Sequence, residues 1–228
     1  MKTLLQTPTG NKLLSHEFYS KLDFKTIPDK SLDLLSDGKI IIEINPDNFA
    51  RAGLKIFKPS WSKEVKLLRN EFKVHEIENG YMLGSPSGMW IYLIEKRSEQ
   101  PEMGHISPSL LGKNAGISLE SPDLLRSEEL FRIIGFKKTY EGENNSWISL
   151  SNDNDFKISI MKPFSCPHLF FNPSVTFFNG KQNTEIINKI RRLHIPITEE
   201  ITVFNDSGKV DNIIIKDPGG LGFFIFND

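Results

Sequence analysis

The chain has 228 residues, a length that fits one large domain or two of about 100 residues each. Its 38 % hydrophobic and 25 % charged residues are typical of an ordinary globular protein. The net charge of −1 argues against nucleic acid or an anionic membrane as partner, and no apolar run reaches the roughly 18 residues of a membrane span. A single cysteine, Cys166, and an N-terminus without a signal peptide's apolar region predict a cytoplasmic protein.

The first quarter of the chain predicts a strand, a helix and three strands. Leu14 and Phe18 belong to a series of apolar residues that recur every four positions, which predicts a helix at 11–22. The clearest strand signal is the β-branched, apolar run at 39–45. The other strands expected in this unit are 1–7, 24–27 and 32–35.

The second quarter repeats this order and leads into a linker. Its helix is expected at 60–72, with Ser60 or Ser62 as the N-cap. The strands expected in this unit are 53–58, 73–77, 81–83 and 89–94. Residues 98–112 combine prolines and glycines with polar residues, which predicts a linker.

The same order returns twice after the linker. One helix is expected to begin at Ser121-Pro122, with Ser121 as the cap and Pro122 at the first helical position, and to end near Gly135. The second helix is expected at 183–194. The strands expected in these two units are 116–120, 137–140, 147–150, 156–161, 174–178, 201–204, 212–216 and 222–226.

This periodicity predicts an α+β protein of four β-α-β-β-β units in two pairs. The expected first domain is 1–97, with units at about 1–48 and 49–97, and the second is 113–228, with units at about 113–165 and 166–228. The second half is longer than the first, and we place the extra residues at 163–173 and 205–210. Inserted loops of this kind often shape a ligand site or a partner surface.

Short motifs recur at matching places in both halves. They are the helix end His16-Glu17-Phe18-Tyr19-Ser20-Lys21-Leu22-Asp23-Phe24 with its counterpart Ile133-Ile134-Gly135-Phe136, the turn Asp37-Gly38 before a β-run, and the turns Ser85-Pro86-Ser87-Gly88 and Asp217-Pro218-Gly219-Gly220. With the fourfold unit order, they make the sequence resemble the vicinal oxygen chelate superfamily over nearly its whole length. That superfamily includes glyoxalase I, bleomycin-resistance proteins and extradiol dioxygenases. The resemblance implies two domains, each a curled mixed sheet with helices on the convex face and a pocket on the concave face.

The chemistry that the resemblance implies depends on a divalent metal. Enzymes of the superfamily hold the ion on the concave face with His and Glu, where it acts as a Lewis acid on two neighbouring substrate oxygens. The corresponding positions here are Leu4, Glu43, Gly53 and Tyr92 in the first half, and Gly116, Ser159 or Met161, Ser174 and Phe224 in the second. One carboxylate among them is not a divalent metal site, which takes three or four converging ligands. We therefore expect no metal and no other cofactor.

Aromatic residues replace the missing ligands in the first half. Strand alternation puts Trp90 and Tyr92 on one face, which predicts a cleft with an aromatic floor. Glu43 and Arg51 are the expected polar anchors for a planar or cationic ligand. Glu43 is also a candidate lone general base. In the second half we favour the interpretation that Phe224 fills the concave face as core.

Three functions fit this pattern. The first, which we favour, is a protein without the family's metal ligands that binds a small, partly aromatic molecule in the first-domain pocket, as bleomycin-resistance proteins of this fold do. The second is a divalent-metal-dependent dioxygenase, lyase or isomerase of the same superfamily. The third is a structural or regulatory interaction protein with filled pockets. The expected partner is a small molecule, and the expected assembly is a monomer or a homodimer.

Overall fold

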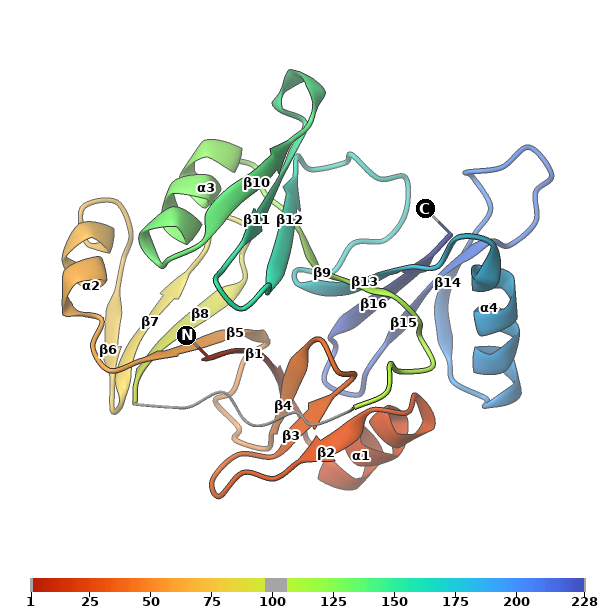
Figure 1. Ribbon diagram of the computed structural model, residues 1–228, viewed down its shortest axis with the longest axis horizontal. Coiled ribbons are helices and arrows are strands. Elements are labelled where there is room, and N and C mark those ends of the chain that lie inside the picture. The colour runs from red at the N-terminus through yellow and green to blue at the C-terminus, as the bar shows by residue number, and fades with distance from the viewer. Residues whose placement is uncertain (1, 97–105, 228) are drawn as a thin grey trace.

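The computed structural model describes residues 2–96 and 106–227 (Figure 1). The α-helices in these ranges are α1 (Lys12–Lys21), α2 (Ser62–Leu68), α3 (Leu124–Ile133) and α4 (Asn183–Arg192), and the short 3-10 helices are η1 (Glu143–Asn145) and η2 (Gly180–Gln182). The strands of the first half are β1 (Lys2–Pro8), β2 (Lys25–Ile27), β3 (Leu34–Ser36), β4 (Ile41–Asn45), β5 (Gly53–Lys58), β6 (His75–Ile77), β7 (Gly80–Gly84) and β8 (Trp90–Glu95). Those of the second half are β9 (Asn114–Glu120), β10 (Lys137–Glu141), β11 (Trp147–Ser151), β12 (Lys157–Met161), β13 (Ser174–Phe178), β14 (Ile197–Ile201), β15 (Asn212–Lys216) and β16 (Gly222–Phe226).

The strands form two eight-stranded sheets of the same topology. The first has the order β2-β3-β4-β1-β5-β8-β7-β6, and the second has the order β10-β11-β12-β9-β13-β16-β15-β14. In each sheet the first strands of the two units pair antiparallel, and each first strand pairs in parallel with the last strand of its own unit. The structure confirms the predicted α+β class and the four β-α-β-β-β units, paired two by two.

One face of both sheets packs with the helices in a single core. Leu5 of β1 and its counterpart Ile117 of β9 are both buried in this core. The helices also connect the halves, because the ring of Phe18 in α1 lies 5.8 Å from that of Phe223 in β16 and α2 contacts α3 (Figure 1). The opposite face of each sheet, which we call the concave face, carries the residues that the sequence singles out.

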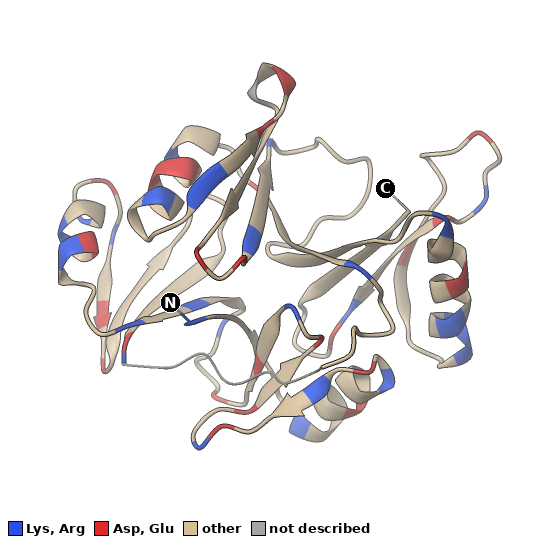
Figure 2. Ribbon diagram, in the orientation of Figure 1, with Lys and Arg blue, Asp and Glu red and all other residues tan. Residues whose placement is uncertain are grey.

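Charged side chains are mixed in sign over the described surface. Figure 2 shows Lys and Arg interspersed with Asp and Glu on the helices and loops of the described chain, without a stripe of one sign. None of the helices in the described ranges is long and apolar enough to cross a membrane.

Three predicted details near element ends were wrong. The strand expected at 201–204 lies earlier in the chain, as β14, which pairs antiparallel with β15 and has a register shift between Ile197 and Glu199. Val203 and Phe204 lie beyond this strand and are 62 % and 51 % exposed. The prediction failed because two neighbouring apolar residues in a loop have the composition of a short strand. Of the cap predictions, α2 begins after Trp61 with no side-chain cap, and the cap of α3 is Asp123, whose Oδ1 accepts the N–H three residues further on at 2.9 Å. Ser121 instead hydrogen-bonds a serine inside α3.

The predicted linker is described only from residue 106 onward, and 98–105 lie outside the described residues. Its described end belongs to the packed structure, because Leu111 is buried in the core and the N–H of Leu110 donates to the carbonyl of Leu22 at 2.9 Å. The domain bounds 1–97 and 113–228 stay a prediction.

The closing turn that begins at Asp217 joins the two halves. Its buried carboxylate accepts hydrogen bonds from Thr7 Oγ1 at 2.8 Å, Tyr19 OH at 2.9 Å and the N–H of Leu221 at 2.7 Å. The turn comes so close to β1 that a Cβ on Gly219 would lie 2.0 Å from the carbonyl oxygen of Pro8, which explains the glycine. Burial raises the pKa of Asp217 against the lowering effect of these donors, and it raises the pKa of Tyr19 together with the Asp217 charge.

This buried carboxyl gives a pH dependence with a defined sign. A group whose pKa is raised on folding stabilises fully below its unfolded pKa of about 3.9 and loses that contribution as the pH rises through the folded pKa. The free energy of unfolding of the wild type, minus that of Asp217→Asn, is therefore expected to fall as the pH rises from about 4 through the raised pKa of folded Asp217. Urea denaturation at several pH values measures the difference.

Asp33 provides the matched control with the opposite sign. Burial raises the pKa of Asp33, but hydrogen bonds from Lys12 and His16 outweigh it and hold the pKa low. The wild-type minus Asp33→Asn difference is expected to rise from acid toward neutral pH. A wild-type minus Asp217→Asn difference that rose in the same way would contradict the buried network.

Candidate functional site

The one carboxylate among the expected metal-ligand positions forms a buried ion pair. Glu43 of β4 is 4 % exposed, and Lys55 Nζ of β5 lies 2.9 Å from its Oε1 and 2.7 Å from its Oε2. The two side chains meet across β1, the strand between β4 and β5. Glu43 therefore faces an ammonium group on the concave face, where the sequence suggested a lone base or a ligand anchor.

A loop at residues 28–33, which we call the strap, lies over this face of the first sheet. Asp29 holds it, with Oδ2 3.4 Å from Lys2 Nζ and Oδ1 accepting the N–H groups of Ser31 and Leu32. Leu32 packs against buried residues of the concave face, namely Leu4, Ile27, Leu34, Ile41 and Phe57. Two hollows remain beside the strap, one of about 480 Å³ that Glu43 helps to line and one of about 440 Å³ that Lys55 helps to line.

The other three predicted site residues lie around the loop before β5. Tyr92 OH donates to the carbonyl oxygen of Arg51 at 3.4 Å, and burial raises the pKa of Tyr92. The Arg51 guanidinium bonds backbone carbonyls of its own loop, and Trp90 is half-buried. Lys55 connects this group with Glu43, because its Nζ lies 5.9 Å from the Tyr92 ring centroid. The structure thus brings Glu43 and Tyr92 together through a lysine.

In the second sheet, the residues at the corresponding strand positions have either an aromatic ring or a small side chain. Phe224 of β16 pairs with Thr176 of β13, which pairs with Gly116 of β9, so Thr176 and not the expected Ser174 lies beside Phe224. Gly116 has φ +108, and a Cβ there would lie 2.5 Å from the carbonyl oxygen of Lys157, which leaves no room for a ligating side chain.

Phe224 is core, as we favoured. It is 2 % exposed, and its ring lies 5.2 Å from that of His168, 5.0 Å from that of Phe170 and 5.4 Å from that of Phe226. His168 and Phe170 come from the predicted insertion, which runs from β12 to β13. The insertion therefore fills one half of the concave face with rings.

The other half of this face is open. A cavity of about 540 Å³ lies beside the aromatic cluster, over β9, β11, β12 and β13. It is lined by Ala115, Ser118, Ser146, Trp147, Ser159, Met161, Ser165, Cys166, Thr176 and Phe178. The ligand site predicted from the sequence lies in the first half, and this cavity was not predicted. The available signal was the recurrence of Ser and Thr at alternate strand positions, where core positions carry Ile and Val.

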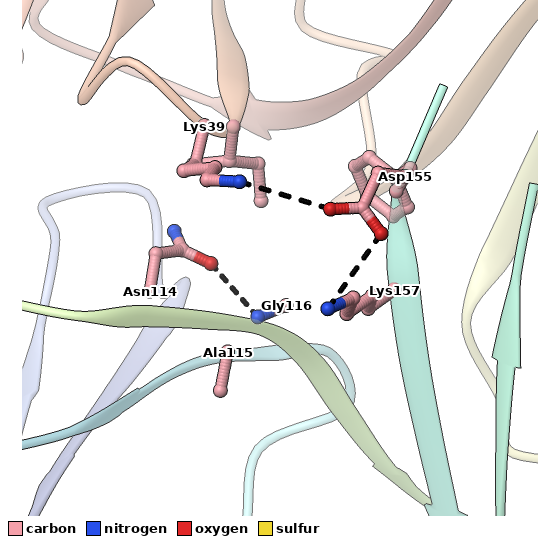
Figure 3. A pocket seen from close by; sticks show the side chains of 8 residues that line it. Lys39, Asn114, Ala115, Gly116, Asp155 and Lys157 are labelled. Atoms are coloured by element: carbon pink, nitrogen blue, oxygen red, sulfur yellow. Dashed lines mark hydrogen bonds and ion pairs between the residues drawn. The ribbon is translucent and has the colours of Figure 1, made fainter. Parts of the chain in front are cut away.

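A smaller crevice lies at the junction of the two sheets (Figure 3). Lys39 Nζ and Lys157 Nζ lie 3.7 Å and 3.6 Å from the carboxylate of Asp155, and Asn114 Oδ1 accepts the N–H of Gly116 at 2.8 Å. Its volume of about 40 Å³ has room for no more than a few water molecules. We interpret the residues around this crevice as part of the contact between the two halves of the chain.

The residues present do not suit a divalent metal of the family type. Among residues 2–96 and 106–227, no three His, Cys, Asp or Glu side chains come together as a possible metal site. In the first half the only carboxylate at these positions is Glu43, which is paired with Lys55. In the second half Gly116 and Thr176 lie in one row with the buried ring of Phe224. These are not the converging anionic and imidazole donors that such ions take.

Comparison with known proteins identifies the fold. The sequence matches no protein-family model and no curated protein sequence. The 2,3-dioxygenase LapB from Pseudomonas sp. KL28 matches with a TM-score of 0.58 over 97 % of this chain and 89 % of its own, at 15 % identity. A variant of homoprotocatechuate 2,3-dioxygenase from Brevibacterium fuscum matches with a TM-score of 0.54 over 99 % of this chain and 70 % of its own, at 13 % identity.

The chain has the vicinal oxygen chelate fold. A catechol 2,3-dioxygenase matches as well, with a TM-score of 0.50 over 97 % of this chain and 85 % of its own, at 14 % identity. These neighbours are extradiol dioxygenases of the superfamily, so the predicted resemblance is confirmed. At such low identity the likeness carries the vicinal oxygen chelate fold, and the chemistry has to come from this chain's own residues.

Proposed function

We propose that this protein binds a small, partly aromatic molecule on the concave surface of its vicinal oxygen chelate fold, in the open half of the second sheet. The cavity of about 540 Å³ there carries the proposal, because small-molecule sites are concave, mostly apolar and supplied with a few polar groups. Trp147, Phe178 and Met161 supply apolar surface, and Ser118, Ser159 and Thr176 supply the polar atoms. An aromatic ligand would pack against these walls.

The first-domain group of Glu43, Trp90, Tyr92 and Arg51 is the second candidate place for the same function. The hollow of about 480 Å³ favours it only through Glu43, which is the one member of this group that lines the hollow. Against it stands the Glu43–Lys55 ion pair, which already satisfies the charge that would anchor a cationic ligand. The enzyme alternative needs a divalent metal, and the donor set described above gives it no support.

A thiol-protection assay tests the second-domain cavity. Cys166 lines it and is the chain's single cysteine, so the rate of alkylation by iodoacetamide reports on this position alone. Burial and the Glu120 charge raise the Cys166 pKa, and the assay therefore runs at about pH 9. In a screen of flat bicyclic aromatic compounds, a binder is expected to slow alkylation and raise the melting temperature.

Matched variants locate the binding. Trp147→Ala is expected to weaken affinity about tenfold, with the fold retained because Trp147 is 37 % exposed. Tyr92→Ala and Glu43→Gln are expected to leave affinity unchanged. If Tyr92→Ala and Glu43→Gln weakened the affinity and Trp147→Ala left it unchanged, the binding site would lie in the first domain. If no compound bound, or if elemental analysis found a stoichiometric divalent metal, the proposal would be wrong, and metal would support the enzyme alternative.

A further inference from the structure

The second-domain cavity is lined without a charged side chain. Its polar side-chain oxygens are hydroxyls, and the rest of its lining is apolar, aromatic or sulfur-containing. Outside the lining, the charge of Glu120 acts on Cys166, and Glu120 Oε1 accepts the N–H of Phe164 at 3.1 Å. This negative charge disfavours an anionic ligand. A cationic ligand would lose its hydration without a counter-charge in the cavity lining, which is costly.

The floor contains hydroxyls that are hydrogen-bonded in pairs. Ser118 Oγ and Thr176 Oγ1, which both line the cavity, lie 2.7 Å apart. Ser159 also lines the cavity, and its Oγ lies 3.2 Å from that of Ser149, which is outside the lining. Ser118 and Thr176 are only 6 % and 4 % exposed, so packing fixes their positions. A hydroxyl has one donor and two acceptor lone pairs. One internal bond leaves each pair with about one donor and three acceptor sites, so the floor mainly accepts hydrogen bonds.

From this lining we propose that the cavity selects a neutral, flat molecule that presents O–H or N–H donors to the serine and threonine floor. The inference rests on the function proposed above and specifies its ligand class. An ester or ketone of the same shape can accept only from the one remaining donor of a pair, and it leaves the more numerous acceptor sites of the floor without a partner. A carboxylate or an amidinium has no ion to pair with in the cavity lining.

Four probes of nearly the same shape test the effects of ligand charge and of hydrogen-bond donors separately. They are 2-naphthamide, which is neutral and has N–H donors, 2-acetonaphthone, which is neutral without donors, 2-naphthoate and 2-naphthamidinium. Protection of Cys166 from alkylation and isothermal titration calorimetry measure their binding. 2-Naphthamide is expected to bind at least about tenfold more tightly than each of the other three, because a missing or unpaired polar partner costs about that much.

The outcomes distinguish this inference from the proposed function. Binding of an ionic probe as tight as that of the amide would overturn the inference and leave the pocket in place. Binding of the amide and the ketone with equal affinity would remove the donor requirement, which also overturns it. If none of the four protected Cys166, the second-domain pocket and the inference would both be rejected.

The double variant Ser118→Ala/Thr176→Val tests the floor itself. It removes both partners of one hydroxyl pair, so no buried hydroxyl is left unpaired, and it nearly conserves shape. Affinity for 2-naphthamide is expected to fall about tenfold while that for 2-acetonaphthone stays within twofold. Ser207→Ala, in an exposed loop, is the control, and melting temperatures show whether each variant is folded. Equal losses for both probes would contradict a hydrogen-bonding floor.

Discussion

Lys55→Ala is expected to lower the free energy of unfolding by about 3–5 kcal/mol, the usual cost of removing one partner of a buried ion pair. The side chains of Lys55 and Glu43 are 13 % and 5 % exposed, so the carboxylate cannot regain its hydration when the ammonium is removed. Urea denaturation, analysed as a two-state transition, gives the change.

A surface ion pair is the matched control. Lys21 lies 2.8 Å from Glu17 with side chains 40 % and 54 % exposed, and Lys21→Ala is expected to cost less than about 1 kcal/mol. The double variant Lys55→Met/Glu43→Leu is expected to recover much of the loss, because it leaves no unpaired charge. A loss for Lys55→Ala that was no larger than the Lys21→Ala loss would mean that water reaches Glu43 and that the first-domain face is open.

Phe224→Ala is expected to lower the free energy of unfolding by about 3–5 kcal/mol, as truncations of buried phenylalanine do. The ring is 2 % exposed and contacts His168 and Phe170 of the inserted segment, so removing it leaves a cavity in a packed cluster. Phe164→Ala is the control, because Phe164 is 96 % exposed and its loss is expected to stay within about 0.5 kcal/mol. A loss below about 1 kcal/mol for Phe224→Ala would show that this ring lines an open pocket.

The sequence predicts the architecture well, for a local reason. Strands, helices and turns leave periodic signals within short windows, and a unit that occurs four times shows them four times. The backbone conformation after the first helix of each half also has a local signal. Gly135 with φ 101 and Asp23 with φ 65 lie at matching places in the two halves. Strand alternation also predicts which residues of one strand share a face, and it puts Trp90 and Tyr92 together.

What the tertiary structure decides is which parts of the concave faces are open. Glu43 and Lys55 meet across an intervening strand, and no spacing rule predicts such a pair. The strap at 28–33 and the insertion before β13 have no periodicity. Their paths depend on long-range packing, of Leu32 against the concave-face cluster that contains Leu4 and of His168 against Phe224. By itself the sequence determined that the chain has the vicinal oxygen chelate fold without the family's usual ligand residues. Only packing decided that rings fill one half of the second concave face and leave a hydroxyl-floored cavity in the other, because loop paths follow from contacts between distant residues.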